Sequence, residues 1–409
     1  MQVFAIAGPA MMANLTTPLI GIVSTTAIGR LGQPAMLGGV AMASVIFDCM
    51  FWLFAFLRMG TVAFTAQSLG AGETGEVRAH LARGLVVAAM IGAALVALQM
   101  PIAAIVLGAM GGSERVSAAA KTYFTIRVWS APLALGNYVV LGWLIGRARA
   151  MLALKMGIAG AAIAAVASEA SGLLLGILIA RHLMRGRLSV PCAVLFDREK
   201  MMRMLAVNRD IMIRTAALIT AFLFFTAQSA RAGDVALAAN SVLNNFLLVS
   251  AFFLDGLANA AEQLCGQAFG ARDKAAFSGA TRLVVAWGFA FAVAVMLVFA
   301  LFGAHLINVM TASEDVRRMA CDFLIFVILS PLLSVFAFTF DGVYIGATWA
   351  RDMRNLMVAS LVIFLSAWWA LRGFGNAGLW GALLVLYAAR GGLEAARYPS
   401  LLKAAFGKG

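Results

Sequence analysis

Charge is scarce in this 409-residue sequence, and negative charge is scarcer than positive. Only 12% of the residues are charged, 31 being Lys or Arg and 18 Asp or Glu, whereas 63% are hydrophobic. A soluble domain carries about 25% charged residues, so the composition excludes a soluble globular fold. Cysteine and histidine are also rare, with four and three copies, and none has the spacing of a metal or redox site.

Motifs for nucleotide binding and for hydrolysis are missing from the sequence. It contains no Walker A loop, no dinucleotide glycine fingerprint, no H-E-x-x-H and no nucleophile elbow. ATP-driven transport therefore has no support within this chain. We predict that the protein is not an enzyme and uses no cofactor.

Long apolar runs are what the sequence has in abundance. They lie at 7–28, 36–68, 84–110, 124–146, 156–180, 211–230, 236–269, 284–310, 323–347, 356–371 and 376–396. A helix of about 20 apolar residues crosses a bilayer, so we predict an all-α polytopic membrane protein with about 11 spans. The opening MQVFAIAGPA lacks the basic start of a cleavable signal peptide, and none is expected.

Basic residues gather in the segments of one side of the membrane. Of the Lys and Arg residues, 20 fall in 70–83, 147–155, 181–209, 272–282, 351–354 and the C-terminus, against 7 in the opposite segments. This asymmetry is the positive-inside signature, so the basic segments and the C-terminus are predicted to be cytoplasmic. The net charge of +13 thus follows from topology, and we expect a lipid bilayer as partner and no nucleic acid.

The chain repeats itself at an offset of 200 residues. TAQSLGAGE at 65–73 corresponds to CGQAFGARD at 265–273, and GWLIG at 142–146 corresponds to GVYIG at 342–346. A constant offset indicates duplicated halves. Both copies of the first motif lead to the basic side, which predicts parallel-repeat helical lobes around a central cavity. The glycines at the ends of the second motif are expected to permit close helix contact within each lobe.

The repeat loses its register near residue 150. GIAGAA at 157–162 best matches GNAGLW at 375–380, at an offset of 218 instead of 200. The second half fills the difference with the apolar run 356–371, so the first lobe is predicted to lack the equivalent of its fifth helix. Only 156–180 then separates two basic segments. Either it is re-entrant, or it spans and the second half is inverted against its charges.

These observations predict a domain organisation of two lobes and a linker. The N-terminal lobe covers 1–190 and lacks helix 5, a cytoplasmic linker covers 191–209, and the C-terminal lobe covers 210–409.

Several longer stretches resemble the multidrug and toxic compound extrusion family, above all its branch of DNA-damage-inducible F-type proteins. They are NLTTPLIGIVSTTAIGRLG, FLRMGTVAFTAQSLGAG, IRVWSAPLALGNYVVLGWLIG, NRDIMIRT, LDGLANAAEQLCGQAFGARD and FDGVYIGATWARDMRN. The resemblance covers nearly the whole chain. It implies twelve helices in two six-helix lobes around a central cavity, so this chain is one span short. It also implies export of cationic or amphipathic compounds in exchange for protons or sodium ions.

The first lobe departs from the pattern of that family in two ways. The branch carries an Asp in a first-helix stretch like GLVDTAVVGHL, where this chain reads GIVSTTAIGRL, so Ser24 replaces the carboxylate and Arg30 the following His. A Ser hydroxyl does not titrate near neutral pH. The family also places Asn and Asp on the fifth helix, which is predicted to be missing. The first-lobe coupling site that the resemblance implies is therefore absent.

Carboxylates inside the predicted spans are the candidates for cation coupling. An ionisable side chain within a span is costly and is by default a functional candidate. The candidates are Glu262, Asp341, Asp255 and Asp48, while Glu169 lies in the segment whose crossing is open. Asp255 and Glu262 are seven residues apart and share a helix face. The alternative for each is a structural bond to a neighbouring Arg or backbone group.

Other residues in the spans are candidates for a cavity, for ion pairs or for a hinge. Candidates for the substrate cavity are Ser24, Asn137, Tyr138, Asn240 and Asn244. Cations that are expected to form structural pairs with the buried acids are Arg58, Arg127 and Arg214. Pro18 is a hinge candidate, with plain kinking of its span as the alternative.

The sequence predicts secondary active efflux of an amphipathic or cationic small molecule by H⁺ or Na⁺ antiport, with alternating access of the two lobes. Two alternatives stay open. A shortened paralogue that no longer transports is favoured by the missing helix and Ser24, and a lipid-linked-sugar flippase would need a strongly basic central cavity. We expect a monomer in the bacterial inner membrane.

Overall fold

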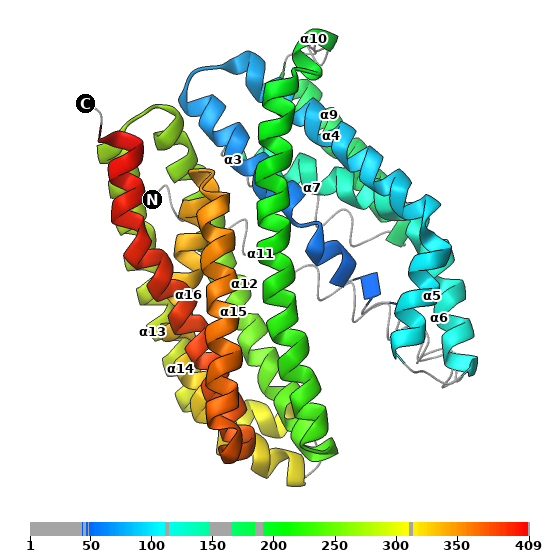
Figure 1. Ribbon diagram of the computed structural model, residues 1–409, viewed down its shortest axis with the longest axis vertical. Helices are drawn as coiled ribbons and strands as arrows, with labels where there is room; N and C mark the ends of the chain where they lie inside the picture. Colours follow the sequence, from blue (N-terminus) through cyan, green and yellow to red (C-terminus); the bar gives the residue numbers. More distant parts are fainter. Residues whose placement is uncertain are drawn as a thin grey trace. The chain divides into compact units, whose positions relative to one another are not determined.

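The computed structural model describes residues 43, 46–47, 49–110, 114–147, 165–184, 191–310 and 314–407, and all regular structure within them is helical. The α-helices are α3 (Phe56–Gly70), α4 (Thr74–Ala97), α5 (Gln99–Met110), α6 (Glu114–Arg127), α7 (Ala131–Gly146), α9 (Ala165–Leu183), α10 (Cys192–Leu195), α11 (Arg198–Arg231), α12 (Asp234–Gly270), α13 (Lys274–Met310), α14 (Glu314–Gly346), α15 (Ala350–Leu371) and α16 (Gly375–Phe406) (Figure 1). The predicted all-α class is confirmed.

Within the described residues, 8 segments are long and apolar enough to cross a membrane. The predicted runs from 211–230 onward coincide with these segments, and the last two merge in one segment, Ala350–Phe406, which holds α15 and α16. Large apolar side chains stay exposed on these helices, as at Leu301 and Phe302 of α13. Such faces suit a hydrocarbon solvent. The run 7–28 lies outside the described residues.

The predicted run 84–110 is divided between two helices. α4 ends at Ala97 and α5 begins at Gln99. The cause is Pro101, which has no backbone N–H to donate to the carbonyl of Ala97 and whose ring clashes with that carbonyl in a continuous helix. The backbone bond from Ile102 to the Leu98 carbonyl, 3.1 Å long, restarts the helical ladder.

The described chain divides into two compact units, one ending at Asn208 and the other running from Arg209 to Gly409. The segment that the sequence assigned to a separate linker therefore belongs to the first unit up to Asn208. The long helix α11 contains the boundary.

The 200-residue repeat reappears in the closest helix contacts of each unit. A Cβ atom on Gly142 would lie 2.4 Å from the carbonyl oxygen of Arg58, and one on Gly342 would lie 2.3 Å from that of Ala258. Gly142 and Gly342 are 200 residues apart, and so are Arg58 and Ala258. Because the helix axes approach to backbone contact at these glycines, α7 packs on α3 as α14 packs on α12. The predicted role of the glycines is confirmed.

The second offset, 218 residues, is also reproduced. A Cβ on Gly136 of α7 would lie 3.1 Å from the Leu173 side chain of α9, and one on Gly391 of α16 would lie 2.7 Å from the Phe336 side chain of α14. Gly136 and Phe336 are 200 residues apart, whereas Leu173 and Gly391 are 218 apart. Thus α9 corresponds to α16. Residues 148–164, on which the predicted loss of helix 5 and the crossing of 156–180 depend, lie outside the described residues.

Candidate functional site

A cluster of buried charges lies inside the second unit. Arg214 of α11 and Arg390 of α16 each donate from Nη2 to the same oxygen, Oδ2, of Asp341 on α14. The exposed fractions of the three side chains are 5%, 2% and 8% in that order, so water does not solvate them. Two guanidinium groups on one carboxylate offset part of the desolvation cost that each charge carries. Arg214 thus pairs with a buried acid.

Glu394 is a second carboxylate in this cluster. It lies one helical turn after Arg390 on α16, and its side chain is fully buried. Neither carboxylate oxygen has a hydrogen-bond partner among the described residues. Its backbone carbonyl accepts a 2.8 Å hydrogen bond from the Tyr344 hydroxyl. Glu394 is not among the predicted carboxylates, although it lies in the predicted run 376–396; its spacing of four residues from Arg390 was the available signal.

α12 carries two of the predicted acids and packs on α14. Asp255 lies within electrostatic range of the Arg390 guanidinium. Glu262 is 2% exposed, and its backbone carbonyl packs on Gly346 of α14, where an added Cβ would lie 2.7 Å from the oxygen. The structure thus gathers three of the four predicted coupling carboxylates in the second unit. The fourth, Asp48, lies outside the described residues, and nothing is described of the Glu169 side chain.

Carboxylates outnumber guanidinium groups in this cluster. Asp210, one turn before Arg214, is neutralised separately by Arg209 and Arg354, at 3.1 and 2.7 Å. The buried or half-buried carboxylates of α12, α14 and α16 are Asp255, Glu262, Asp341 and Glu394, and the buried guanidinium groups described in this unit are those of Arg214 and Arg390. If all four were ionised, the negative charges would exceed the positive charges by two. Such a concentration of buried carboxylates is costly in a low dielectric unless the charges are compensated.

The predicted substrate-cavity residues have different surroundings. The side-chain amide of Asn240 donates to Ser229 and Asn376, each at 2.8 Å, while its oxygen accepts from Asn376 at 3.0 Å and from Trp380 at 2.8 Å. All four hydrogen-bonding positions of that amide are therefore used in packing α11, α12 and α16 together. Half-buried candidates are Asn137, Tyr138 and Asn244, and Ser24 lies outside the described residues.

The predicted ion-pair residues of the first unit make the following contacts among the described residues. The guanidinium of Arg127 lies 4.9 Å from the ring centroid of Phe47 and donates a 3.0 Å hydrogen bond to the Tyr123 hydroxyl. Both contacts stabilise the guanidinium, and whether Arg127 also pairs with an acid stays a prediction. Arg58 supplies the α3 backbone carbonyl against which α7 packs, and the hinge candidate Pro18 lies outside the described residues.

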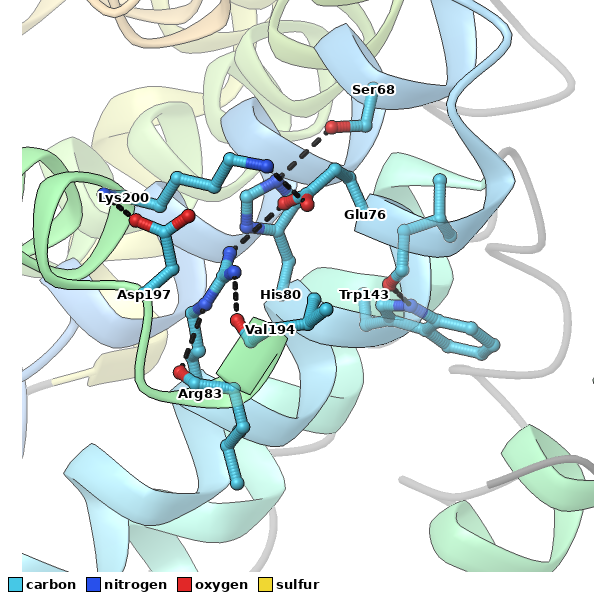
Figure 2. A network of polar contacts seen from close by, with 10 residues as sticks. Ser68, Glu76, His80, Arg83, Trp143, Val194, Asp197 and Lys200 are labelled. Carbon is cyan, nitrogen blue, oxygen red and sulfur yellow. Dashed lines mark hydrogen bonds and ion pairs between the residues drawn. The ribbon is translucent and has the colours of Figure 1, made fainter. Parts of the chain in front are cut away.

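A second polar network joins α10 and the start of α11 to α4 within the first unit (Figure 2). Arg83 of α4 is fully buried and donates from Nε to the Leu195 carbonyl at 3.2 Å and from Nη2 to the Val194 carbonyl. Its Nη1 bonds Glu76 at 3.0 Å, and Glu76 also binds Lys200. We call these contacts the α4–α10 clamp. Sequence reasoning missed it because Arg83 was counted only as a basic loop residue.

We predict that Arg83→Lys releases α10. Lys keeps the positive charge beside Glu76 but cannot present the planar fork that reaches two carbonyls, so both bonds to α10 are lost. Hydrogen bonds to charged groups contribute about 1.5–3 kcal/mol, which corresponds to at least about tenfold more frequent opening of this segment. Trypsin cleavage of the purified protein near Arg198 measures the opening. Arg78→Lys, on the same helix, is the matched control, and equal cleavage of both variants would contradict the clamp.

Comparison with known proteins relates both units to one family. The MatE family model matches residues 9–168 and 211–367, one stretch in each predicted half. DNA damage-inducible protein F of Escherichia coli (strain K12) is 36% identical over 405 residues, which are 94% of this chain and 88% of that protein. A probable multidrug resistance protein NorM of Caulobacter vibrioides is 25% identical, over 94% of this chain and 88% of its own.

Solved structures share the fold. One described as the outward-facing conformation of a multidrug resistance MATE family transporter of the MOP superfamily superimposes with a TM-score of 0.87 at 16% identity. The superposition covers 99% of this chain and 96% of the other.

Proposed function

This chain belongs to the MatE family of multidrug efflux transporters, and from that membership we propose that it expels amphipathic or cationic small molecules in exchange for H⁺ or Na⁺. The two lobes alternate between access to the two sides of the membrane. The coupling cation binds in the second unit, at the cluster that holds Asp341, Glu262 and Asp255.

The excess of buried negative charge in the second unit is the observation that carries this proposal. Two guanidinium groups face four carboxylates there, and Asp341 alone is shared by both Arg214 and Arg390. A cation that enters the cluster lowers the cost of holding these carboxylates in a low dielectric. Because only differential binding shifts a conformational equilibrium, the cation drives transport when it binds one lobe arrangement more tightly than the other. In this proposal the second unit carries the coupling function that the resemblance implies for the first helix, where Ser24 stands.

We expect purified protein in liposomes to move ethidium, a planar aromatic cation, against its gradient when a proton or a sodium gradient is imposed. Glu262→Gln removes an ionisable buried carboxylate while keeping its shape, and it should abolish gradient-driven accumulation. The rise in ethidium fluorescence on binding to encapsulated DNA follows the transport directly.

Glu314→Gln provides the matched control. Glu314 is on α14, and its side chain is 71% exposed, so its amide variant should transport at the wild-type rate. If wild-type liposomes move neither ethidium nor tetraphenylphosphonium under either gradient, the proposal fails and the non-transporting alternative takes its place. Movement of a fluorescent lipid-linked pyrophosphate in the same liposomes would instead establish the flippase alternative.

A further inference from the structure

The hydrogen bonds around Asp341 are distributed unevenly. Its Oδ2 accepts from both Arg214 and Arg390, while its Oδ1 is buried and has no hydrogen-bond partner among the described residues. The Nε groups of both arginines are also buried without a partner there. Because arginine bonds a carboxylate best through two parallel bonds, this arrangement uses only part of the bonding capacity of each group.

Glu394 offers Arg390 a second place to bond. The two residues are four apart on α16, the spacing at which side chains of one helix meet. Both oxygens of Glu394 are buried without a hydrogen-bond partner among the described residues, so an ionised Glu394 can accept a two-pronged bond from the same guanidinium. Asp341 then keeps Arg214, and each carboxylate has one arginine. Two alternative pairings of one buried guanidinium form a two-state element.

The charges that face Glu394 decide between the two pairings. On its own helix the neighbour is Arg390, and on α14 the Tyr344 hydroxyl is bonded to its backbone carbonyl. The Asp341 carboxylate is bonded to Arg390, the helix neighbour of Glu394. Arg390 pairs with Asp341 in the structure, and this is the pairing expected when Glu394 is neutral. With Glu394 ionised, the nearest cation that can neutralise it is Arg390.

Charged groups on the other packed helices act on Arg390 from farther away. Asp255 on α12 lies within electrostatic range of Arg390, and Arg214 on α11 competes with it for Asp341. Toward the end of α16, Arg397 is paired with Asp352 of α15 at 3.0 Å and does not supply a free cation. Arg390 is therefore the cation whose position depends on the charge of Glu394.

We propose that Glu394 is the proton carrier of the second unit and that Arg390 alternates between Asp341 and Glu394. When Glu394 takes a proton from water it becomes a neutral acid, and Arg390 bonds Asp341. When Glu394 returns the proton to water it becomes a carboxylate, and Arg390 moves to it, leaving Asp341 to Arg214 alone. One proton enters and one leaves in each cycle. The role of this proton cycle in drug export rests on the proposed function. The movement of Arg390 between Asp341 and Glu394 does not.

The test is an infrared difference spectrum of the purified wild-type protein between acidic and neutral pH. The carbonyl stretch of a protonated, buried carboxylic acid should appear at acidic pH, be lost in Glu394→Gln and shift in Glu394→Asp. Glu394→Met, which is neutral and of similar length, supplies a second folded variant without the group. Glu314→Gln should keep the wild-type band. A band that persists in Glu394→Gln and disappears in Asp341→Asn would assign the proton to Asp341 and overturn the proposal.

Ethidium transport by the same variants separates this inference from the proposed function. Glu394→Gln should lose proton-driven accumulation while it keeps ethidium exchange between equal concentrations, which needs no net proton movement. If Glu394→Gln accumulates ethidium under a proton gradient as well as the wild-type protein does, the inference is overturned and the proposed function is left intact. If the wild-type protein moves no ethidium but the infrared band depends on Glu394, the proposed function fails and the proton site stands.

Discussion

Asp341→Ala is expected to destabilise the second unit by about 3–5 kcal/mol, the range found when one partner of a buried ion pair is removed. The variant leaves Arg214 and Arg390 facing each other with no shared carboxylate, in a place where their side chains are nearly inaccessible to water. Two like charges then add repulsion to the desolvation cost of each. Chemical denaturation of the purified protein in detergent micelles measures the change in the free energy of unfolding.

The stability of a matched variant distinguishes this mechanism from simple loss of a side chain. Asp322 is on the same helix but exposed, and Asp322→Ala should change stability by less than about 0.5 kcal/mol. Adding Arg214→Met and Arg390→Met to Asp341→Ala should recover most of the lost stability, because a buried ion cluster can be replaced by apolar groups of similar volume. Wild-type stability of Asp341→Ala would show that the two guanidinium groups are neutralised elsewhere.

The helical architecture follows closely from the sequence because apolar run length and repeat offset are set by the bilayer and by gene duplication. Gly142 and Gly342 could be matched by offset alone, and both lie at backbone contacts. The break after Ala97 is a local effect of Pro101, which a count of apolar residues does not detect. The hydrophobicity of a segment measures how much of it is apolar, whereas the end of α4 depends on the one backbone N–H that Pro101 lacks.

The candidate site could be predicted only in part, since pairing is a three-dimensional property. Asp341, Glu262 and Arg214 are recognisable as costly polar residues inside apolar runs. Arg390 can share Asp341 with Arg214 only because α16 packs beside α14. The sequence alone does not predict which helices are neighbours. Asn240 illustrates the converse, because an amide inside a span suggests a ligand, yet here it is saturated by Ser229 and other protein groups.

Gly342→Leu is expected to prevent close packing of α12 on α14 and to lower the yield of folded protein severely. The first added carbon would lie 2.3 Å from the carbonyl oxygen of Ala258 and 2.8 Å from Cβ of Ala261. Overpacking commonly costs about 1–3 kcal/mol, and this site should reach or exceed the upper value because the obstructing atom is backbone and cannot change rotamer. Separation of the helices would also displace Gly346 from Glu262, so α12 would no longer pack against the part of α14 that carries Asp341.

Gly392→Leu tests the same substitution without the obstruction. Gly392 lies in the middle of α16, and a Cβ there would meet nothing within 4 Å. Because glycine in a helix is less stable than other residues by about 0.5–1 kcal/mol, this control should leave stability unchanged or raise it slightly.

Gly142→Leu should repeat the defect in the first unit, where the Arg58 carbonyl takes the place of that of Ala258. Size-exclusion profiles and unfolding midpoints of the three variants measure the effect. Equal behaviour of Gly342→Leu and Gly392→Leu would mean that the repeated glycines reflect helix flexibility and not contact between backbones.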